Sequence, residues 1–313
     1  MPIPPGLRDG LRLPAIAAPM FLVSGPDLVV ETCRGGLVGS FPALNARTSG
    51  QLRDWLRDIR ARLAALPEAA PFAVNLIVHR SNPRLQDDLA VCIEERVPLI
   101  ITSLGAVPEL VTQVQGAGGL VFHDVINARH GAKAAAAGVD GLIAVAAGAG
   151  GHAGTFSPFA LIRELRGVFG GTLVLAGAIG DGAQLAAARL MGADMAYLGT
   201  RFIATEESLA PEGFKRMIVE ARAEDILHTP AISGVPANFL RPSLIAGGLD
   251  PENLPAAGKL DLEGEAKAWR DFWSAGHGVG AITDIPPAAA LCDRLLAEYR
   301  AALAACAGWE TGG

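Results

Sequence analysis

The segment at residues 148–154, which reads GAGGHAG, combines four glycines with one histidine and follows an apolar run. Glycine has no side chain, so its backbone can pass close to a flat ligand. An imidazole can donate a hydrogen bond, accept one or carry charge near neutral pH. Isolated histidines are more often structural than catalytic, but this one lies on a glycine-rich loop after an apolar run, where functional residues concentrate. We therefore expect His152 to take part in catalysis.

Two further glycine-containing turns have the chemistry of an anion site. Residues 176–182 read AGAIGDG, and residues 197–201 read YLGTR. Each turn places glycines where backbone N–H groups can approach an anion, and the threonine adds a hydroxyl donor. Either turn alone is equally well explained as a tight connection between elements, but their joint placement favours an anion site. Four residues would form it: Gly177, Ala178, Gly199 and Thr200.

Polar residues interrupt apolar runs at two other places. Asn75 lies within the run FAVNLI, and His123 and Asp124 lie within LVFHDV. A buried polar group needs a hydrogen-bond partner, and the edge of a flavin ring supplies both donors and acceptors. A backbone partner is the alternative for Asn75, and an internal pair would satisfy His123 and Asp124 equally well. Near the start of the chain, Pro19 and Met20 would place a rigid turn and a soft side chain beside the same ligand.

The elements that must position these residues follow one rhythm over the first 220 residues. Short apolar runs rich in Val, Ile and Leu alternate with helical stretches, which predicts parallel strands joined by helical crossovers. Eight such units predict a closed TIM (β/α)8 barrel, in which the active site lies at the C-terminal ends of the strands and the last two loops commonly bind phosphate. The expected strands are 13–20, 37–41, 72–78, 99–104, 120–125, 141–147, 172–178 and 195–200.

Two of the crossovers have clear helical patterns. In the run 49–66, leucine and isoleucine recur at helical spacing, Ser49 is the expected N-cap, and Pro67 stops the helix. The alanine-rich stretch from Asp181 to Leu190 predicts another crossover helix.

The rhythm breaks after about residue 224. Frequent Pro and Gly between 225 and 285 predict an irregular cap subdomain over the barrel mouth, from which His277 could reach the site. A last amphipathic helix, roughly 287–306, should pack back on the outer ring. The expected division is a barrel core at 1–224, a cap at 225–285 and a C-terminal helix within 286–313.

Composition excludes several classes of function. The chain has a net charge of −6 and its 26 basic residues are scattered, which argues against nucleic acid as a partner. No apolar stretch approaches the roughly 18 residues of a membrane span, and the N-terminus lacks the pattern of a signal peptide, so we expect a cytoplasmic protein. The four cysteines lie far apart, which predicts reduced thiols and no metal site. The oligomeric state stays open, with a homodimer as one option.

Taken together, these residues resemble the nitronate monooxygenases, formerly called 2-nitropropane dioxygenases. The resemblance runs over most of the chain, and the Gly-Gly-His element carries most of its specificity. The matching motifs are APM at 18–20, Asn75, GGHAG at 150–154, SPFA at 157–160, AGAI at 176–179, GAD at 192–194 and GTRF at 199–202.

The resemblance implies a barrel that binds FMN without a covalent bond and without a metal. It implies that His152 is the active-site base or anion-stabilising group, in an enzyme that oxidises a nitronate or similar small anion with O2 to a carbonyl compound and nitrite. The implied FMN contacts are Pro19, Met20, Asn75, Asp124, Gly150 and Gly151 around the ring, and Gly177, Ala178, Gly199 and Thr200 around the phosphate.

Two positions depart from the family pattern. Many members have Gln where this chain has Val145, and Gln is also frequent at the position of Asp124. Two alternatives therefore stay open. FMN-dependent NAD(P)H oxidoreductases, such as enoyl-acyl carrier protein reductases and quinone reductases, look similar around the histidine segment. A flavin-binding barrel without turnover is less favoured, because simple binding would not need His152 on the loop.

Overall fold

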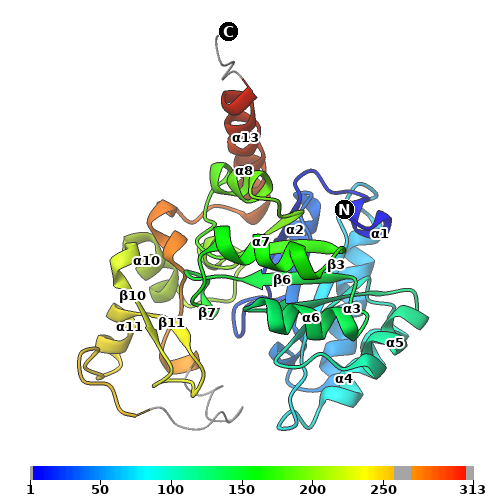
Figure 1. Cartoon of the computed structure of the whole chain (residues 1–313), viewed down its shortest axis with the longest axis horizontal. Coiled ribbons are helices and arrows are strands. Elements are labelled where there is room, and N and C mark those ends of the chain that lie inside the picture. Colours follow the sequence, from blue (N-terminus) through cyan, green and yellow to red (C-terminus); the bar gives the residue numbers. More distant parts are fainter. Residues whose placement is uncertain (1–2, 257–268, 308–313) are drawn as a thin grey trace.

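The computed structural model describes residues 3–256 and 269–307, and its centre is a closed barrel of eight parallel strands (Figure 1). The order around the barrel is β1-β9-β8-β6-β5-β4-β3-β2. A bridge between Ile16 and Val38 joins the two ends of that order, with Ala17 N donating to Val38 O at 2.9 Å. The predicted TIM barrel is confirmed. Its strands are β1 (Ala15–Ala17), β2 (Gly39–Pro42), β3 (Phe72–Ile77), β4 (Leu99–Ser103), β5 (Leu120–Val125), β6 (Gly141–Val145), β8 (Thr172–Ala176) and β9 (Met195–Leu198).

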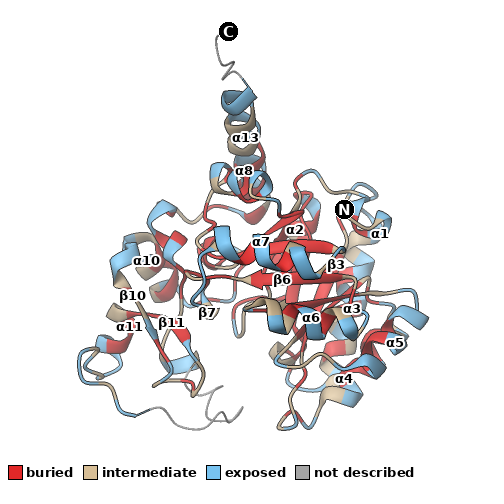
Figure 2. Ribbon diagram, in the orientation of Figure 1, coloured by how far each residue is buried: buried red, intermediate tan, exposed pale blue. Residues whose placement is uncertain are grey.

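Helices cover the outside of the barrel, and each of the first seven barrel strands along the chain is followed by one. Their outer faces are exposed while the strands are buried (Figure 2). These helices are α2 (Pro26–Arg34), α3 (Ser49–Ala64), α4 (Leu85–Glu94), α5 (Pro108–Gly116), α6 (Ala128–Ala136), α7 (Pro158–Val168) and α8 (Gly182–Leu190). After β9 come the short α9 (Thr200–Ile203) and α10 (Glu212–Glu220). No helix among residues 3–256 and 269–307 has the length and apolar character needed to cross a lipid bilayer.

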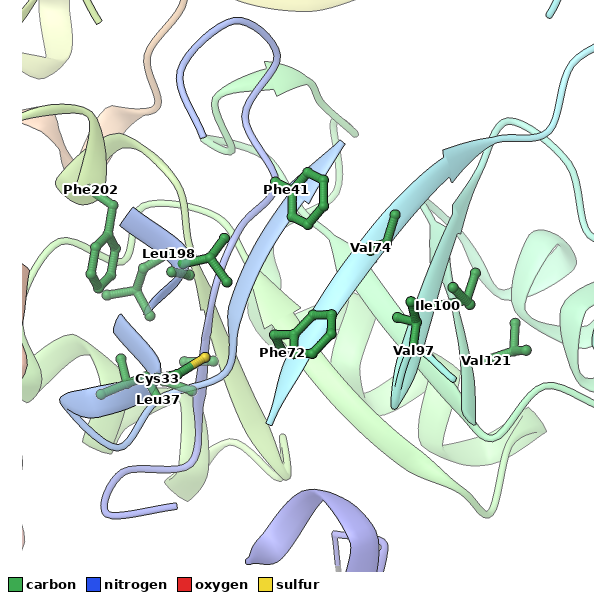
Figure 3. Packing of buried hydrophobic residues seen from close by; sticks show 14 of the residues in the cluster. Cys33, Leu37, Phe41, Phe72, Val74, Val97, Ile100, Val121, Leu198 and Phe202 are labelled. Carbon is green, nitrogen blue, oxygen red and sulfur yellow. The ribbon is translucent and has the colours of Figure 1, made fainter. Parts of the chain in front are cut away.

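The core has two layers because successive strand residues point to opposite faces. One set, including Ile16, Phe122 and Val174, fills the inside of the barrel. The other lies between the strands and the helices, and Figure 3 shows part of it, with Val74 and Ile100 among the labelled residues. Burial on both faces explains why the strands read as nearly continuous apolar runs.

The N-cap of α3 is Thr48, so the expected cap at Ser49 is wrong by one residue. Thr48 has extended backbone angles and its hydroxyl accepts from Gln51 N at 3.1 Å. Ser49 is the first residue of the helix, and its hydroxyl donates to Asp88 Oδ1 at 2.6 Å. An N-cap residue must have non-helical backbone angles while its side chain reaches the first turn, and only Thr48 meets both conditions here.

The region after residue 224 contains an ordered hairpin as well as irregular chain. Strands β10 (Ile226–Thr229) and β11 (Ala237–Leu240) pair antiparallel, and β11 also pairs with β7 (Gly151–His152), which belongs to the loop after β6. The elements α11 (Arg241–Ala246) and η3 (His277–Ala281) follow. The part of the expected cap at 257–268 lies outside the described residues, and the boundaries of the cap stay a prediction.

The C-terminal helix α13 (Ala288–Ala307) lies against α8 at very short range. A Cβ atom placed on Gly182 would overlap the backbone oxygen of Leu295, and Gly182 N donates to Glu298 Oε2 at 2.8 Å. The far end of α13 projects away from the barrel (Figure 1), and its last residues are largely exposed. Glycine at this position is therefore what allows α13 to pack against α8.

We expect Gly182→Ala to lower the free energy of unfolding by about 1–3 kcal/mol, because the added methyl group must push α13 outward. Gly167→Ala in α7 is the matched control, since a Cβ there meets no atom within 4 Å. Urea unfolding of both variants measures the difference. Equal stability of the Gly182 variant and the wild type would contradict the close packing of α13 on α8.

Candidate active site

A cavity of about 970 Å³ opens at the C-terminal ends of the barrel strands. Its volume is at the upper end of the range for small-molecule sites, roughly 300–1,000 Å³. Its walls come from the loops at the C-terminal ends of the barrel strands and from two later segments, the connection between β10 and β11 and residues 269–278. Every residue predicted for the site lies on this wall: Pro19, Met20, Asn75, Asp124, Gly150, Gly151, His152, Gly177, Ala178, Gly199 and Thr200.

His152 lies on β7, between the barrel and the hairpin. Gly148 and Gly151 have φ angles of +85° and +70°, a conformation that side chains rarely adopt, which explains glycine at both positions. His152 pairs with Ala237 of β11 in the antiparallel ladder. Its ring makes a T-shaped contact with the ring of Trp269 at a centroid distance of 5.6 Å. His152 is thus held by β11 and by Trp269, and it borders the cavity.

Asp124 is the acidic group of the cavity wall. Ser103 Oγ donates to Asp124 Oδ2 at 2.5 Å, and Asn75 Nδ2 donates to Ser103 Oγ at 2.8 Å and to Ile101 O at 3.2 Å. Among the described residues, no hydrogen-bond partner meets the other carboxylate oxygen, Oδ1. Burial raises the pKa of Asp124 to about 6, although the Ser103 hydrogen bond and the nearby charge of His152 lower it. The carboxyl group therefore has a free position for a ligand.

His123 has its own partner, so it does not need Asp124. Its Nδ1 shares a hydrogen bond of 2.7 Å with Thr102 Oγ1. Burial lowers the pKa of His123 to about 4, which keeps the ring neutral near pH 7. Tyr197 also lines the cavity, and burial together with Asp124 raises the pKa of its phenol well above the ordinary value. It stays a protonated hydrogen-bonding group.

The expected anion turns, with Gly177, Ala178, Gly199 and Thr200, form a cradle, and two glycines beside or within it have no room for a side chain. A Cβ atom on Gly177, whose φ is +137°, would lie 2.9 Å from Ala147 O, and one on Gly150 would lie 3.1 Å from Thr200 Oγ1. Ala178 adopts a left-handed φ of +55° although it is not glycine. Such strain is typical of residues that shape a binding site.

The threonine hydroxyl of this cradle is oriented by a later segment of the chain. Gly276 N donates to Thr200 Oγ1 at 2.8 Å. Since the hydroxyl accepts there, its own hydrogen remains for a ligand. The glycine cradle, this hydroxyl and the unpartnered Oδ1 of Asp124 therefore fit a ligand with a phosphate group and a polar ring edge, as FMN has.

Several wall residues were not predicted from the sequence. Ser103 and Tyr197 lie in the C-terminal halves of barrel strands, as Asn75 and Asp124 do, so the same pattern could have identified them. Gly276 and Gly278 line the cavity through contacts that no local pattern indicates. His277, between these two glycines, is exposed, and its backbone N–H donates to Gly148 O at 2.9 Å.

The cysteines lie away from this chemistry. Cys33, Cys92 and Cys292 are buried, and Cys306 is exposed, all as free thiols. Burial raises the pKa of Cys33 and of Cys292 to about 12, so both stay protonated. In the described part of the chain, no group of three or more His, Cys, Asp or Glu side chains is arranged to hold a metal ion.

Known proteins are similar to this chain in sequence and in fold. The family model for nitronate monooxygenase matches residues 9–298. A nitronate monooxygenase from Paraburkholderia phytofirmans is 31% identical, over 93% of each chain. Two solved structures superpose with a TM-score of 0.82: a nitroalkane oxidase from Streptomyces ansochromogenes, 27% identical over 96% of this chain and 99% of its own, and FabK from Thermotoga maritima, 25% identical over 96% and 97%. The chain therefore belongs to the nitronate monooxygenase family and is a flavin-dependent oxidoreductase.

Proposed function

We propose that this protein holds FMN in the strand-end cavity and oxidises alkyl nitronates with O2 to a carbonyl compound and nitrite. One observation carries the proposal: His152, the half-buried Asp124 and a glycine cradle border the same cavity. Bound FMN would supply a redox centre that takes electrons from the substrate and passes them to O2. The reactants are then small molecules that a cavity of about 970 Å³ can admit together with the cofactor.

Two parts of the wall would hold the two ends of FMN. The cradle offers backbone N–H groups and the Thr200 hydroxyl, which suit a phosphate. Asn75 and Asp124 offer an amide and a carboxyl group, which suit the polar edge of the ring. The residues proposed for the phosphate are Gly177, Ala178, Gly199 and Thr200, joined by Gly276 and Gly278, and those proposed for the ring are Pro19, Met20, Asn75, Asp124, Gly150 and Gly151.

His152 would act on the substrate itself. A nitronate already carries a negative charge, so the imidazole only has to position and stabilise it. A neutral nitroalkane must first lose a proton, which requires a base. The ring contact with Trp269 and the backbone pairing with Ala237 support a fixed orientation of the imidazole for either task.

A second candidate is an FMN-dependent NAD(P)H oxidoreductase, because FabK superposes as well as the nitroalkane oxidase does. The electron donor separates the two. Anaerobic rapid mixing of the flavin-loaded protein with an alkyl nitronate, and separately with NADPH, should bleach the flavin absorbance with the nitronate only. Bleaching by NADPH alone would favour the reductase.

We expect the purified protein to release FMN, and Gly199→Asp to weaken FMN binding at least about tenfold, because a carboxylate would face the phosphate. The backbone tolerates this change, since a Cβ on Gly199 would meet only Ala18 Cβ at 3.6 Å and Met20 at 3.9 Å. Mass spectrometry of the released cofactor and flavin titration of the apoprotein measure both points. Gly167→Asp on the outer surface is the control. Release of FAD, or full FMN affinity in the Gly199 variant, would refute the proposed cofactor site.

Asp124→Asn should change how the stability of the apoprotein depends on pH. The folded pKa of Asp124, about 6, lies above the ordinary 3.8, so between these values the folded chain binds more protons than the unfolded chain. The stability of the wild type relative to the variant should therefore fall as the pH rises from about 4 to 6, by on the order of 2–3 kcal/mol, and then level off. Urea unfolding from pH 4 to 8 measures it, with Asp54→Asn on the exposed face of α3 as control. A difference that does not vary with pH would show that Asp124 is not buried as a titrating group.

His152→Asn should separate base catalysis from anion binding. The variant keeps a hydrogen-bond donor but loses the base, so activity on a neutral nitroalkane should fall by about 10²–10⁴-fold, while nitronate oxidation should fall much less. Nitrite release with each substrate, normalised to FMN content, measures the effect. Equal and small losses on both substrates would instead make His152 a structural residue of the loop.

A further inference from the structure

The loop that carries His152 takes its hydrogen-bond partners from residues far along the chain. Asn238 Nδ2 donates to Ala149 O at 2.6 Å, across 89 positions of sequence. On the other side, Gly151 N donates to Ser274 Oγ at 2.6 Å, across 123 positions. The backbone on the N-terminal side of His152 is therefore held at two points, by Asn238 of β11 and by Ser274.

Asn238 is the centre of these contacts. Its side chain is almost fully buried, and its backbone pairs with Gly151 in the ladder between β7 and β11. Its carbonyl oxygen accepts from Ser274 Oγ at 2.6 Å, and this same hydroxyl accepts the Gly151 N–H. Asn238 thus meets Ala149 directly and Gly151 both through the ladder and through Ser274.

The hairpin also reaches the imidazole ring, through Trp269. Phe239, the next residue on β11, stacks on Trp269 at 4.9 Å between ring centroids, and Trp269 in turn makes the T-shaped contact with the His152 ring. The same strand therefore sets both the backbone and the ring surroundings of His152. A shift of β11 would move the imidazole relative to the cavity.

We propose that Asn238 is a positioning residue, which fixes His152 and the ring-side wall of the cavity through its amide contact with Ala149 and its ladder contact with Gly151. Ala149 is itself a wall residue and is buried, so its carbonyl oxygen would lose its amide partner if the Asn238 amide were removed. The position of Ala149 matters for FMN because the next residue, Gly150, lies so close to Thr200 that a Cβ atom on it would be 3.1 Å from Thr200 Oγ1. The effect on turnover rests on the proposed function, whereas the effect on the loop does not.

Asn238→Asp tests this role, because the carboxylate keeps the size of the amide and replaces the donor with an oxygen that faces the Ala149 carbonyl. The control is His228→Ala: His228 Nδ1 contacts the other side of the same amide, Asn238 Oδ1, at 3.0 Å, and His228 is exposed. Ser274→Ala is a second test, since it removes only the acceptor of Gly151 N and the donor to Asn238 O.

Hydrogen–deuterium exchange of the flavin-free protein gives a readout that is independent of activity. We expect Asn238→Asp and Ser274→Ala to speed exchange in the peptide that contains Gly151 and Ala153 about tenfold, with β3 and β8 unchanged and the His228 variant like the wild type. The FMN dissociation constant should rise about tenfold in Asn238→Asp, and kcat for the nitronate should fall more than KM changes.

Two results would overturn the proposal. The first is wild-type exchange in the loop and wild-type FMN affinity in both variants. The second is faster exchange in the barrel strands by the same factor as in the loop, which would make Asn238 a residue of global stability. If the wild type binds flavin but does not oxidise nitronates, the proposed function fails, while exchange and FMN affinity still decide the role of Asn238.

Discussion

The backbone contact that joins β1 to β2 closes the sheet, and the site depends on that closure. In an open sheet of the same order, β1 and β2 would lie at opposite edges, and residues after β1 would be far from those of β3. The bridge between Ile16 and Val38 turns the sheet into a ring, so that Met20, Asn75 and Gly150 face the same space. The closed ring also leaves no free edge, which makes the arrangement of the strand ends rigid.

Much of the barrel could be predicted because each strand is buried on both faces and so reads as an apolar run. All eight expected strands are present, and most of the expected ranges run one to three residues past the strand ends. The polar residues within these runs, Asn75, His123 and Asp124, all line the cavity, as do the glycines of the turns that follow other strands. Thr48 was missed as a cap because its neighbour Ser49 has an equally suitable side chain, and only the backbone angles separate the two.

The hairpin and the glycines at 276 and 278 could not be predicted, for a different physical reason. The contacts of these later segments with the histidine loop join residues 80 to 130 positions apart, and no local pattern carries that information. Short strands such as β7, with two residues, have too few residues for any periodicity. The sequence therefore indicates which side chains do the chemistry, but not which distant residues hold them in place.

The pairing of β7 with β11 has a consequence for the order of events during synthesis. The last barrel strand ends at Leu198, yet the partner of Gly151 in the ladder is Asn238. A ribosome that adds about 5–20 residues per second needs roughly 2–8 seconds to travel from the end of β9 to the end of the hairpin. During that interval the emerging chain already has its full set of barrel strands, while the loop that carries His152 has no partner strand. The barrel and its active site are thus completed at different times, and a chain that stops after β9 would have the first without the second.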